Sequence, residues 1–237
     1  MEALKGRDLL SLADLSAEEI LWLLDFAAQL KAGQVEPNCP KVLGLLFSEA
    51  STRTRVSFST AMYHMGGEVL DLNSSLTQVG RGEPVEDTAR VLDRYIDVAA
   101  IRTFEQAEVE TFANYAKIPV INALTDLEHP CQILADLLTV FEEFNQFSDL
   151  TLTYLGDGNN IAHSLLLGCA LVGLNIRVAT PAAYQPLPEI VAKAKEIAGD
   201  RLLIDITSDP KEAVRGTNIL YTDVWASMGQ EAQAVER

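Results

Sequence analysis

Short runs of β-branched and large aliphatic residues alternate along the chain with longer stretches whose apolar positions recur every three or four residues. The short runs are typical of buried strands and the longer stretches of amphipathic helices. Strands and helices that alternate in this way predict βαβ units around a parallel sheet. Pro84 is expected to be the first residue of its helix, where a missing N–H costs nothing. The first series contains expected strands at 42–47, 68–72, 98–102 and 118–122, and expected helices at 16–31, 52–65, 84–96, 105–116 and 130–144.

A second series begins where residues 147–150, FSDL, interrupt this rhythm. The pattern therefore predicts an α/β protein with two doubly wound parallel-sheet domains. We place the first domain at residues 1–145 and the second at residues 146–237. The strands expected in the second series lie at 150–155, 175–180, 201–206 and 218–223.

Composition excludes several classes of protein. The 237 residues carry a formal net charge of −16, which argues against a nucleic-acid partner because such a partner needs a basic face. No apolar run reaches the length of a membrane span, and the N-terminus has no secretory pattern. Cys39, Cys131 and Cys169 are far apart and form no CxxC pair. A reducing cytoplasm is therefore expected, without a zinc site or disulfide framework.

Residues 48–58, SEASTRTRVSF, place two arginines among several hydroxyl side chains directly after the first expected strand. A helix that starts near residue 52 offers unpaired N–H groups and the positive end of its dipole at this point. Hydroxyls and a guanidinium there suit a phosphate group. The alternative is a simple helix cap followed by solvated arginines. The residues expected to bind the anion are Ser51, Thr52, Arg53 and Thr54, whereas Arg55 is expected on the opposite side of the helix.

Residues 128–138, EHPCQILADLL, follow the fourth expected strand. Pro130 fits the first position of a helix, and His129 and Gln132 share one face of it. They could hold a small polar group between them. The alternative for a lone histidine is a structural or surface residue. Cys131 is expected only to pack, because the sequence offers it no base.

Together, these two segments resemble the aspartate/ornithine carbamoyltransferase family. STRTR resembles the family's carbamoyl-phosphate loop, and HPCQILADLLT resembles its carbamoyl-polarising motif. The resemblance extends from LKGRDLLSLADLS near the N-terminus to TDVWASMGQE near the C-terminus. It implies that Thr54, Arg102 and His129 stabilise charge on the carbonyl oxygen. It also implies that Gln132 orients the carbamoyl NH₂ and that Arg53 holds the phosphate. No metal or organic cofactor is expected.

GDGNN at 156–160 and DVWASMG at 223–229 resemble the ornithine-binding segments of the family's ornithine branch, and aspartate carbamoyltransferases lack the second segment. Without the resemblance, GDGNN could be a degenerate nucleotide-binding loop, but the three-glycine spacing of a dinucleotide site is missing. The residues implied to bind ornithine are Asn160, Asp223, Ser227 and Met228.

The resemblance assigns Gln78, within SSLTQVGRGE, to the active site of a neighbouring subunit and therefore implies a homotrimer with shared active sites. Without the family, the same segment is a polar surface loop. The implied activity gives citrulline and phosphate from ornithine and carbamoyl phosphate, in arginine biosynthesis. Two alternatives are a carbamoyltransferase for another amine, such as putrescine, and a truncated, non-catalytic carbamoyl-phosphate-binding paralogue. The family's HCLP segment and final helix are absent from the sequence, so the second domain is expected to be C-terminally incomplete.

Overall fold

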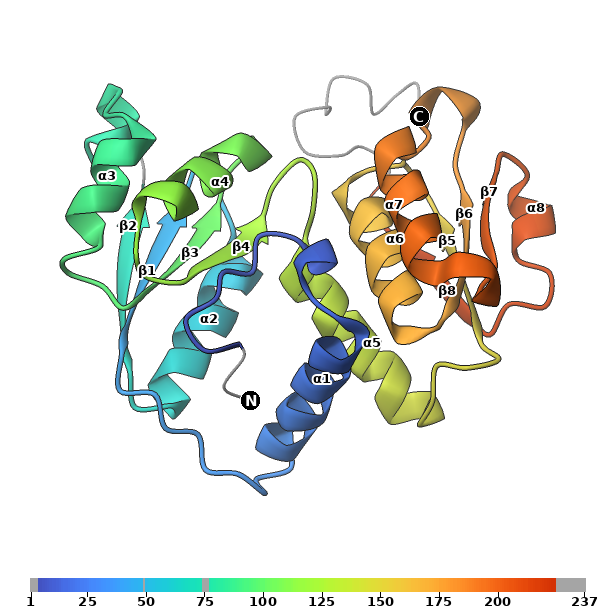
Figure 1. Ribbon diagram of the computed structural model, residues 1–237, viewed down its shortest axis with the longest axis horizontal. Coiled ribbons are helices and arrows are strands. Elements are labelled where there is room, and N and C mark those ends of the chain that lie inside the picture. The colour runs from blue at the N-terminus through green and yellow to red at the C-terminus, as the bar shows by residue number, and fades with distance from the viewer. Residues whose placement is uncertain (1–3, 49, 74–76, 225–237) are drawn as a thin grey trace. The chain divides into compact units, whose positions relative to one another are not determined.

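The computed structural model describes residues 4–48, 50–73 and 77–224. The chain packs as two compact units, each with one parallel four-stranded sheet (Figure 1). Unit 1 comprises the described residues up to Asp14 together with Asp25–Asp126. Unit 2 comprises Leu15–Leu24 together with the described residues from Leu127 onward.

The sheet of unit 1 has the strand order β2-β1-β3-β4, and all its strands are parallel. The chain moves from β1 to one edge and then returns to build the other edge, so the direction of winding changes between β1 and β3. Open α/β sheets bind ligands at such a switch point, beyond the carboxyl ends of the strands. The strands are β1 (Val42–Phe47), β2 (Glu68–Asn73), β3 (Val98–Arg102) and β4 (Val120–Leu124), and the helices are α2 (Thr52–His64), α3 (Val85–Leu92) and α4 (Gln106–Tyr115). Helix α1 (Ala17–Lys31) is divided between unit 2, up to Leu24, and unit 1, from Asp25.

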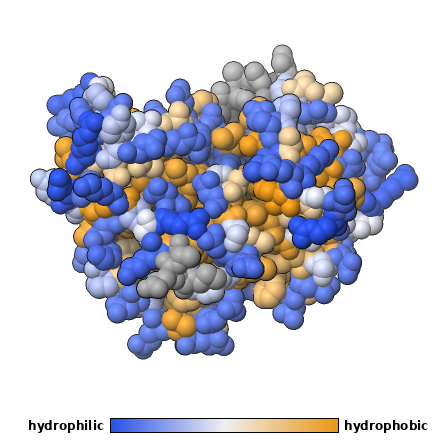
Figure 2. Space-filling model, viewed as in Figure 1, coloured by the Kyte–Doolittle hydropathy of each residue, from blue (hydrophilic) through white to orange (hydrophobic). Residues whose placement is uncertain are grey.

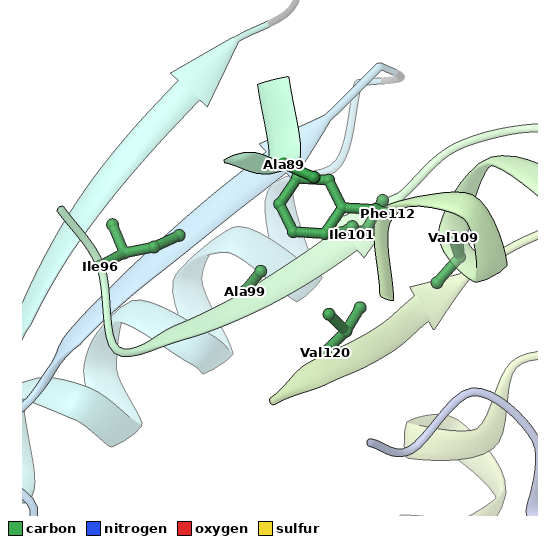
Figure 3. Close-up of a cluster of buried hydrophobic side chains, with 7 residues drawn as sticks. All are labelled: Ala89, Ile96, Ala99, Ile101, Val109, Phe112 and Val120. Carbon is green, nitrogen blue, oxygen red and sulfur yellow. The ribbon is translucent and has the colours of Figure 1, made fainter. Parts of the chain in front are cut away.

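Helices cover both faces of this sheet. On one face, Ala89 of α3 and Phe112 of α4 pack in a buried cluster against β3 and β4 (Figure 3). On the other face, Met62 of α2 packs in a cluster with Leu45 of β1 and Ala100 of β3. Neighbouring residues of a strand point to opposite faces of the sheet. Because both faces are buried, β1 and β3 are nearly continuous apolar runs in the sequence. The doubly wound arrangement predicted for the first half is confirmed.

Two elements of unit 1, α3 and β4, differ from their predicted ranges by more than one residue. Pro84 is not the first helical residue: it caps α3 with φ −57° and ψ 141°, and the helix runs only from Val85 to Leu92. The strand expected at 118–122 begins at Val120 instead. The carboxylate of Asp93 accepts the N–H groups of Lys117 and Ile118 at 2.6 and 3.1 Å, so these amides are not available to a neighbouring strand.

Unit 2 repeats the plan with the strand order β7-β6-β5-β8, again fully parallel. Here the switch point lies between β5 and β8. The strand expected at 201–206 begins at Ile204, because a 3₁₀ turn occupies Gly199–Arg201. The strands are β5 (Thr151–Leu155), β6 (Asn175–Ala179), β7 (Ile204–Thr207) and β8 (Ile219–Thr222), and the helices are α5 (Pro130–Phe144), α6 (Asn160–Val172), α7 (Pro188–Ala198) and α8 (Pro210–Ala213).

Adjacent residues of β5 show that unit 2 also carries helices on both faces. The hydroxyl of Thr153 donates to the carbonyl of Ala213 in α8 at 3.0 Å. The next side chain, Tyr154, points the other way and donates from its hydroxyl to Asn159, the cap of α6, at 3.3 Å. The second doubly wound domain is therefore confirmed as well.

Hydrophilic residues gather on the surface over α3 (Figure 2), where Arg90 and Asp87 form an exposed ion pair with an N–O distance of 2.7 Å. No helix within the described ranges is long and apolar enough to cross a membrane.

Candidate active site

The first helical turn after β1 forms the candidate anion site of unit 1. α2 starts at Thr52, as the sequence predicted. Ser51 precedes it with an extended backbone (φ −153°, ψ 111°), and its side chain caps none of the helix N–H groups. No capping side chain of Ser51 therefore competes with an anion for the first-turn amides. Thr54 lies half-buried in the same turn.

The two arginines of this turn differ in their surroundings. Arg55 forms an ion pair with Asp71 of β2, and its guanidinium carbon lies 4.9 Å from the centroid of the Phe47 ring. Arg53 is exposed and forms no ion pair with any residue that the structure describes. Arg55 is therefore committed to the packing of α2 against the sheet, and Arg53 remains available to a ligand.

Arg102 ends β3, next to β1 and on the same edge of the sheet as the anion site. The N–H of Ser48 donates to the carbonyl of Arg102 at 2.9 Å, and the hydroxyls of Ser48 and Thr103 lie 3.4 Å apart. These contacts hold the ends of β1 and β3 together at the switch point. The pairing of β3 with β4 shifts register between Ile101 and Arg102, and Arg102 is half-buried.

Gln78 also belongs to unit 1. It lines a cavity of about 480 Å³ between the sheet and the α3–α4 layer. Ser48 and Thr103 border this cavity, but Arg53 and Arg102 do not. Two carboxylates for which the sequence predicted no role also line it: Glu83, which accepts from Thr88 at 2.8 Å, and Glu108, which accepts from Thr103.

His129 and Gln132 belong to unit 2 by their packing. Pro130 is the first residue of α5, as predicted, and His129 is the residue directly before the helix. The backbone N–H of His129 donates to the hydroxyl of Ser164 in α6 at 2.8 Å. The imidazole of His163 accepts from the N–H of Leu187 at its Nε2 (3.1 Å) and therefore donates from Nδ1 to the carbonyl of Leu127 (2.9 Å). Residues of α6 thus fix the loop that presents His129, and no sequence motif marked them.

A hydrogen-bonded chain connects Gln132 to β8. Nε2 of Gln132 donates to Oδ1 of Asp136 at 3.0 Å, and the hydroxyl of Tyr221 donates to Oδ2 of Asp136, also at 3.0 Å. Burial raises the pKa of Asp136 and the Asp223 carboxylate raises it further, whereas the two hydrogen bonds act in the opposite direction. Burial, together with nearby carboxylates, also raises the pKa of Tyr221 and of Tyr154.

The candidate amine site lies at the switch point of unit 2. Asp223 directly follows β8, and Asn159 follows β5. Nδ2 of Asn159 donates to Oδ2 of Asp223 at 3.2 Å, while its Oδ1 accepts the N–H groups of Ile161 and Ala162 at the start of α6. The family resemblance pointed to Asn160, the first residue of α6, and not to Asn159. Ser227 and Met228 lie outside the described residues.

Cys131 lies on α5, next to Gln132 in the sequence. Burial raises the pKa of the Cys131 thiol to about 12, which favours the protonated thiol over the nucleophilic thiolate at neutral pH. Within the described part of the chain, no three His, Cys, Asp or Glu side chains form a group that could hold a metal ion.

Both halves of the chain resemble known protein domains. Residues 7–142 match the profile of the aspartate/ornithine carbamoyltransferase carbamoyl-P binding domain, and residues 148–237 match that of the Asp/Orn binding domain. The chain is 66% identical over its full length to an ornithine carbamoyltransferase of Thermosynechococcus vestitus, of which it covers 76%. It is 64% identical, again over its full length, to one of Nostoc punctiforme, of which it covers 78%.

Solved structures agree at the level of the fold. The structure of ornithine carbamoyltransferase from Pyrococcus furiosus aligns with a TM-score of 0.91 and 44% identity, over 98% of this chain and 76% of that one. The structure from Gloeobacter violaceus aligns with a TM-score of 0.86 and 58% identity, over 92% of this chain and 74% of that one. Both halves of the sequence and both sheets thus point to one family, and the chain is a member of the aspartate/ornithine carbamoyltransferases.

Proposed function

We propose that this chain transfers the carbamoyl group of carbamoyl phosphate to the δ-amine of L-ornithine, giving L-citrulline and phosphate. The observation that carries the proposal is the identity of 64–66%, along all 237 residues, to relatives named ornithine carbamoyltransferase. Carbamoyl-phosphate binding is assigned to residues 1–145 and ornithine binding to residues 146–237. This division is supported by the break between the two profile matches, which lies between residues 142 and 148.

The phosphate is held at the start of α2. Arg53 supplies a fork of charged donors, and the first-turn amides and the hydroxyls of Ser51 and Thr52 add neutral donors. The exposure of Arg53 and its lack of an ion pair with described residues support this role. These donors stabilise the phosphate as it leaves, because its negative charge grows when the bond to the carbonyl carbon breaks.

The carbonyl oxygen becomes an oxyanion when the neutral δ-amine attacks the carbonyl carbon. Thr54, Arg102 and His129 donate to this oxygen, and Gln132 accepts from the carbamoyl NH₂. Donors that are already in place when the charge develops lower the barrier most. The hydrogen bond from the His129 backbone to Ser164, 2.8 Å long, supports such preorganisation.

Ornithine is held by Asp223, which attracts its α-ammonium group, and by Asn160, Ser227 and Met228. The position of Asp223 at the switch point of the second sheet supports this assignment. Purified protein incubated with carbamoyl phosphate should form citrulline from ornithine, and much less product from putrescine or aspartate. Product formation from putrescine at a higher kcat/KM would favour the other amine as substrate. Binding of carbamoyl phosphate without any turnover would favour a non-catalytic role.

The proposal extends to a homotrimer in which Gln78 serves the neighbouring subunit, working in arginine biosynthesis in the cytoplasm. The position of Gln78 on a cavity that Arg53 and Arg102 do not border supports the assignment to another subunit. We expect light scattering to give a trimer mass. Mixing Gln78→Ala and Arg53→Ala subunits should restore part of the activity that each variant lacks, because some mixed sites contain neither substitution.

Asn159→Asp should weaken ornithine binding specifically. The new carboxylate can still cap α6, but it lies where Nδ2 now donates to Asp223 at 3.2 Å, so it repels Asp223 instead of holding it. We expect the KM for ornithine to rise about tenfold, while the KM for carbamoyl phosphate changes little. Steady-state kinetics with each substrate varied in turn would measure this. An equal rise in both KM values would contradict the assignment.

A further inference from the structure

Asp136 lies between two parts of the proposed site. On one side its Oδ1 accepts from Nε2 of Gln132, and on the other its Oδ2 accepts from the hydroxyl of Tyr221, both at 3.0 Å. Gln132 and Asp136 are four residues apart on α5 and therefore share a face of the helix. Tyr221 lies on β8, two residues before Asp223.

The contact with Asp136 determines which end of the Gln132 amide is available to a ligand. A carboxylate only accepts hydrogen bonds, so the amide must turn its NH₂ toward Asp136 and leave Oε1 as the group that can accept. The carbamoyl NH₂ is a donor and needs such an acceptor. Without Asp136 the amide could rotate by half a turn and present its own NH₂ to the carbamoyl NH₂. Both groups are donors, so no hydrogen bond would form between them.

The contact with Tyr221 determines where Asp136 itself lies. The Tyr221 ring packs beside the Tyr154 ring, with centroids 6.0 Å apart, and β8 pairs with β5 along its length. The hydroxyl that holds Asp136 is thus carried by a paired strand of the sheet. That same strand leads directly to Asp223.

We propose that Asp136 is a positioning residue: it fixes the amide of Gln132 in the orientation that accepts from the carbamoyl NH₂, and it couples this orientation to β8, the strand that leads directly to Asp223, the carboxylate proposed to bind ornithine. This inference rests on the proposed function, because it takes the role of Gln132 from there. Asp136 contacts neither substrate in this account and acts only through Gln132.

A double-mutant cycle separates positioning from simple structural support. We expect Gln132→Ala and Asp136→Ala each to lower kcat about tenfold, with little change in the KM for carbamoyl phosphate, whose phosphate is held by other residues. In the Gln132→Ala background, Asp136→Ala should lower kcat by no more than about twofold, because it acts through a side chain that is already gone. Additive losses in the double variant would overturn the proposal.

Conservative variants sharpen the test. Asp136→Asn can still accept from Gln132 through its Oδ1 and can donate to the Tyr221 oxygen, so it should recover most of the kcat lost in Asp136→Ala. Tyr221→Phe keeps the ring but removes the hydroxyl and should give an intermediate kcat. Glu143→Ala, which removes an exposed carboxylate from the same helix, should match the unsubstituted chain. An Asp136→Asn variant as slow as Asp136→Ala would count against positioning.

A measurement that needs no turnover keeps the inference distinct from the proposed function. The side-chain NH₂ signal of Gln132 in an ¹⁵N NMR spectrum can be assigned by its loss in Gln132→Ala. We expect this signal to exchange slowly with water, to do so faster in Asp136→Ala, and to be retained in Asp136→Asn. If the chain forms no citrulline, the proposed function fails, while this signal still decides the geometry. An unchanged signal in Asp136→Ala overturns the inference even if citrulline forms.

Discussion

Gly158→Ala should be among the most damaging single substitutions in unit 2. A Cβ atom at this position would lie 2.1 Å from the backbone nitrogen of Pro186 and 2.3 Å from the carbonyl carbon of Gln185. Backbone atoms cannot rotate away as the end of a side chain can. The facing segment is also anchored, because the carbonyl of Tyr184 accepts from the N–H of Gly158 at 2.7 Å and from the hydroxyl of Thr180 at 2.8 Å.

The two backbone segments must therefore separate, which we expect to cost about 3 kcal/mol of unfolding free energy. The displacement reaches Asn159, the next residue, which holds both the start of α6 and Asp223. The KM for ornithine should rise by more than about tenfold, and the melting temperature should fall by several degrees.

Gly33→Ala is the matched control for this substitution. It adds the same methyl group at a left-handed residue, φ +68°, where no described atom beyond the chain neighbours lies within 4 Å of the added Cβ. Only the conformational penalty applies, about 1 kcal/mol, and ornithine binding should not change. Thermal unfolding and kinetics of the two variants would compare a steric clash with backbone strain. A Gly158→Ala variant with normal ornithine kinetics would show that the turn moves without disturbing Asn159.

Local patterns were enough to predict the architecture. Parallel strands buried on both faces appear as unbroken apolar runs, so β1 and β3 were predicted at their observed bounds. Pro130 marked the start of α5 correctly, because a proline at the first helical position has a local cause. At β4 the prediction failed because a distant side chain decided the boundary. Asp93 binds the amides of Lys117 and Ile118, and nothing near residue 118 indicates this.

The residues of the candidate site also fall into those that a local pattern could predict and those that it could not. The turn at Arg53 could be predicted because its residue types and its place after a strand share one short segment. The pair of Asp136 and Tyr221 is separated by 85 residues in sequence, and no periodicity connects the two. Two adjacent asparagines set a further limit on prediction. Helical spacing could not decide whether the side chain of Asn159 or that of Asn160 faces Asp223, because this depends on which of them caps α6.

Arg53→Ala should cause the largest loss of carbamoyl-phosphate affinity in unit 1. The substitution removes a charged donor fork from the start of α2, where the first-turn N–H groups remain but carry only partial charge. Hydrogen bonds to a charged group contribute about 1.5–3 kcal/mol, which corresponds to an affinity about 10- to 100-fold weaker. Calorimetric titration with carbamoyl phosphate, and with inorganic phosphate as a stable probe, would measure it.

Arg55→Ala is the control that this turn itself provides, because it removes the same side chain two residues away. Arg55 is bound to Asp71 and stacked on Phe47, so its loss should act on folding. The ion pair is partly exposed and contributes little, and the ring contact adds about 0.5–1 kcal/mol, so the melting temperature should fall by only a few degrees. Phosphate affinity should remain near that of the unsubstituted chain. Equal losses of affinity in both variants at an unchanged melting temperature would mean that both guanidinium groups bind the anion, and that the contacts of Arg55 with Asp71 and Phe47 are released when the ligand binds.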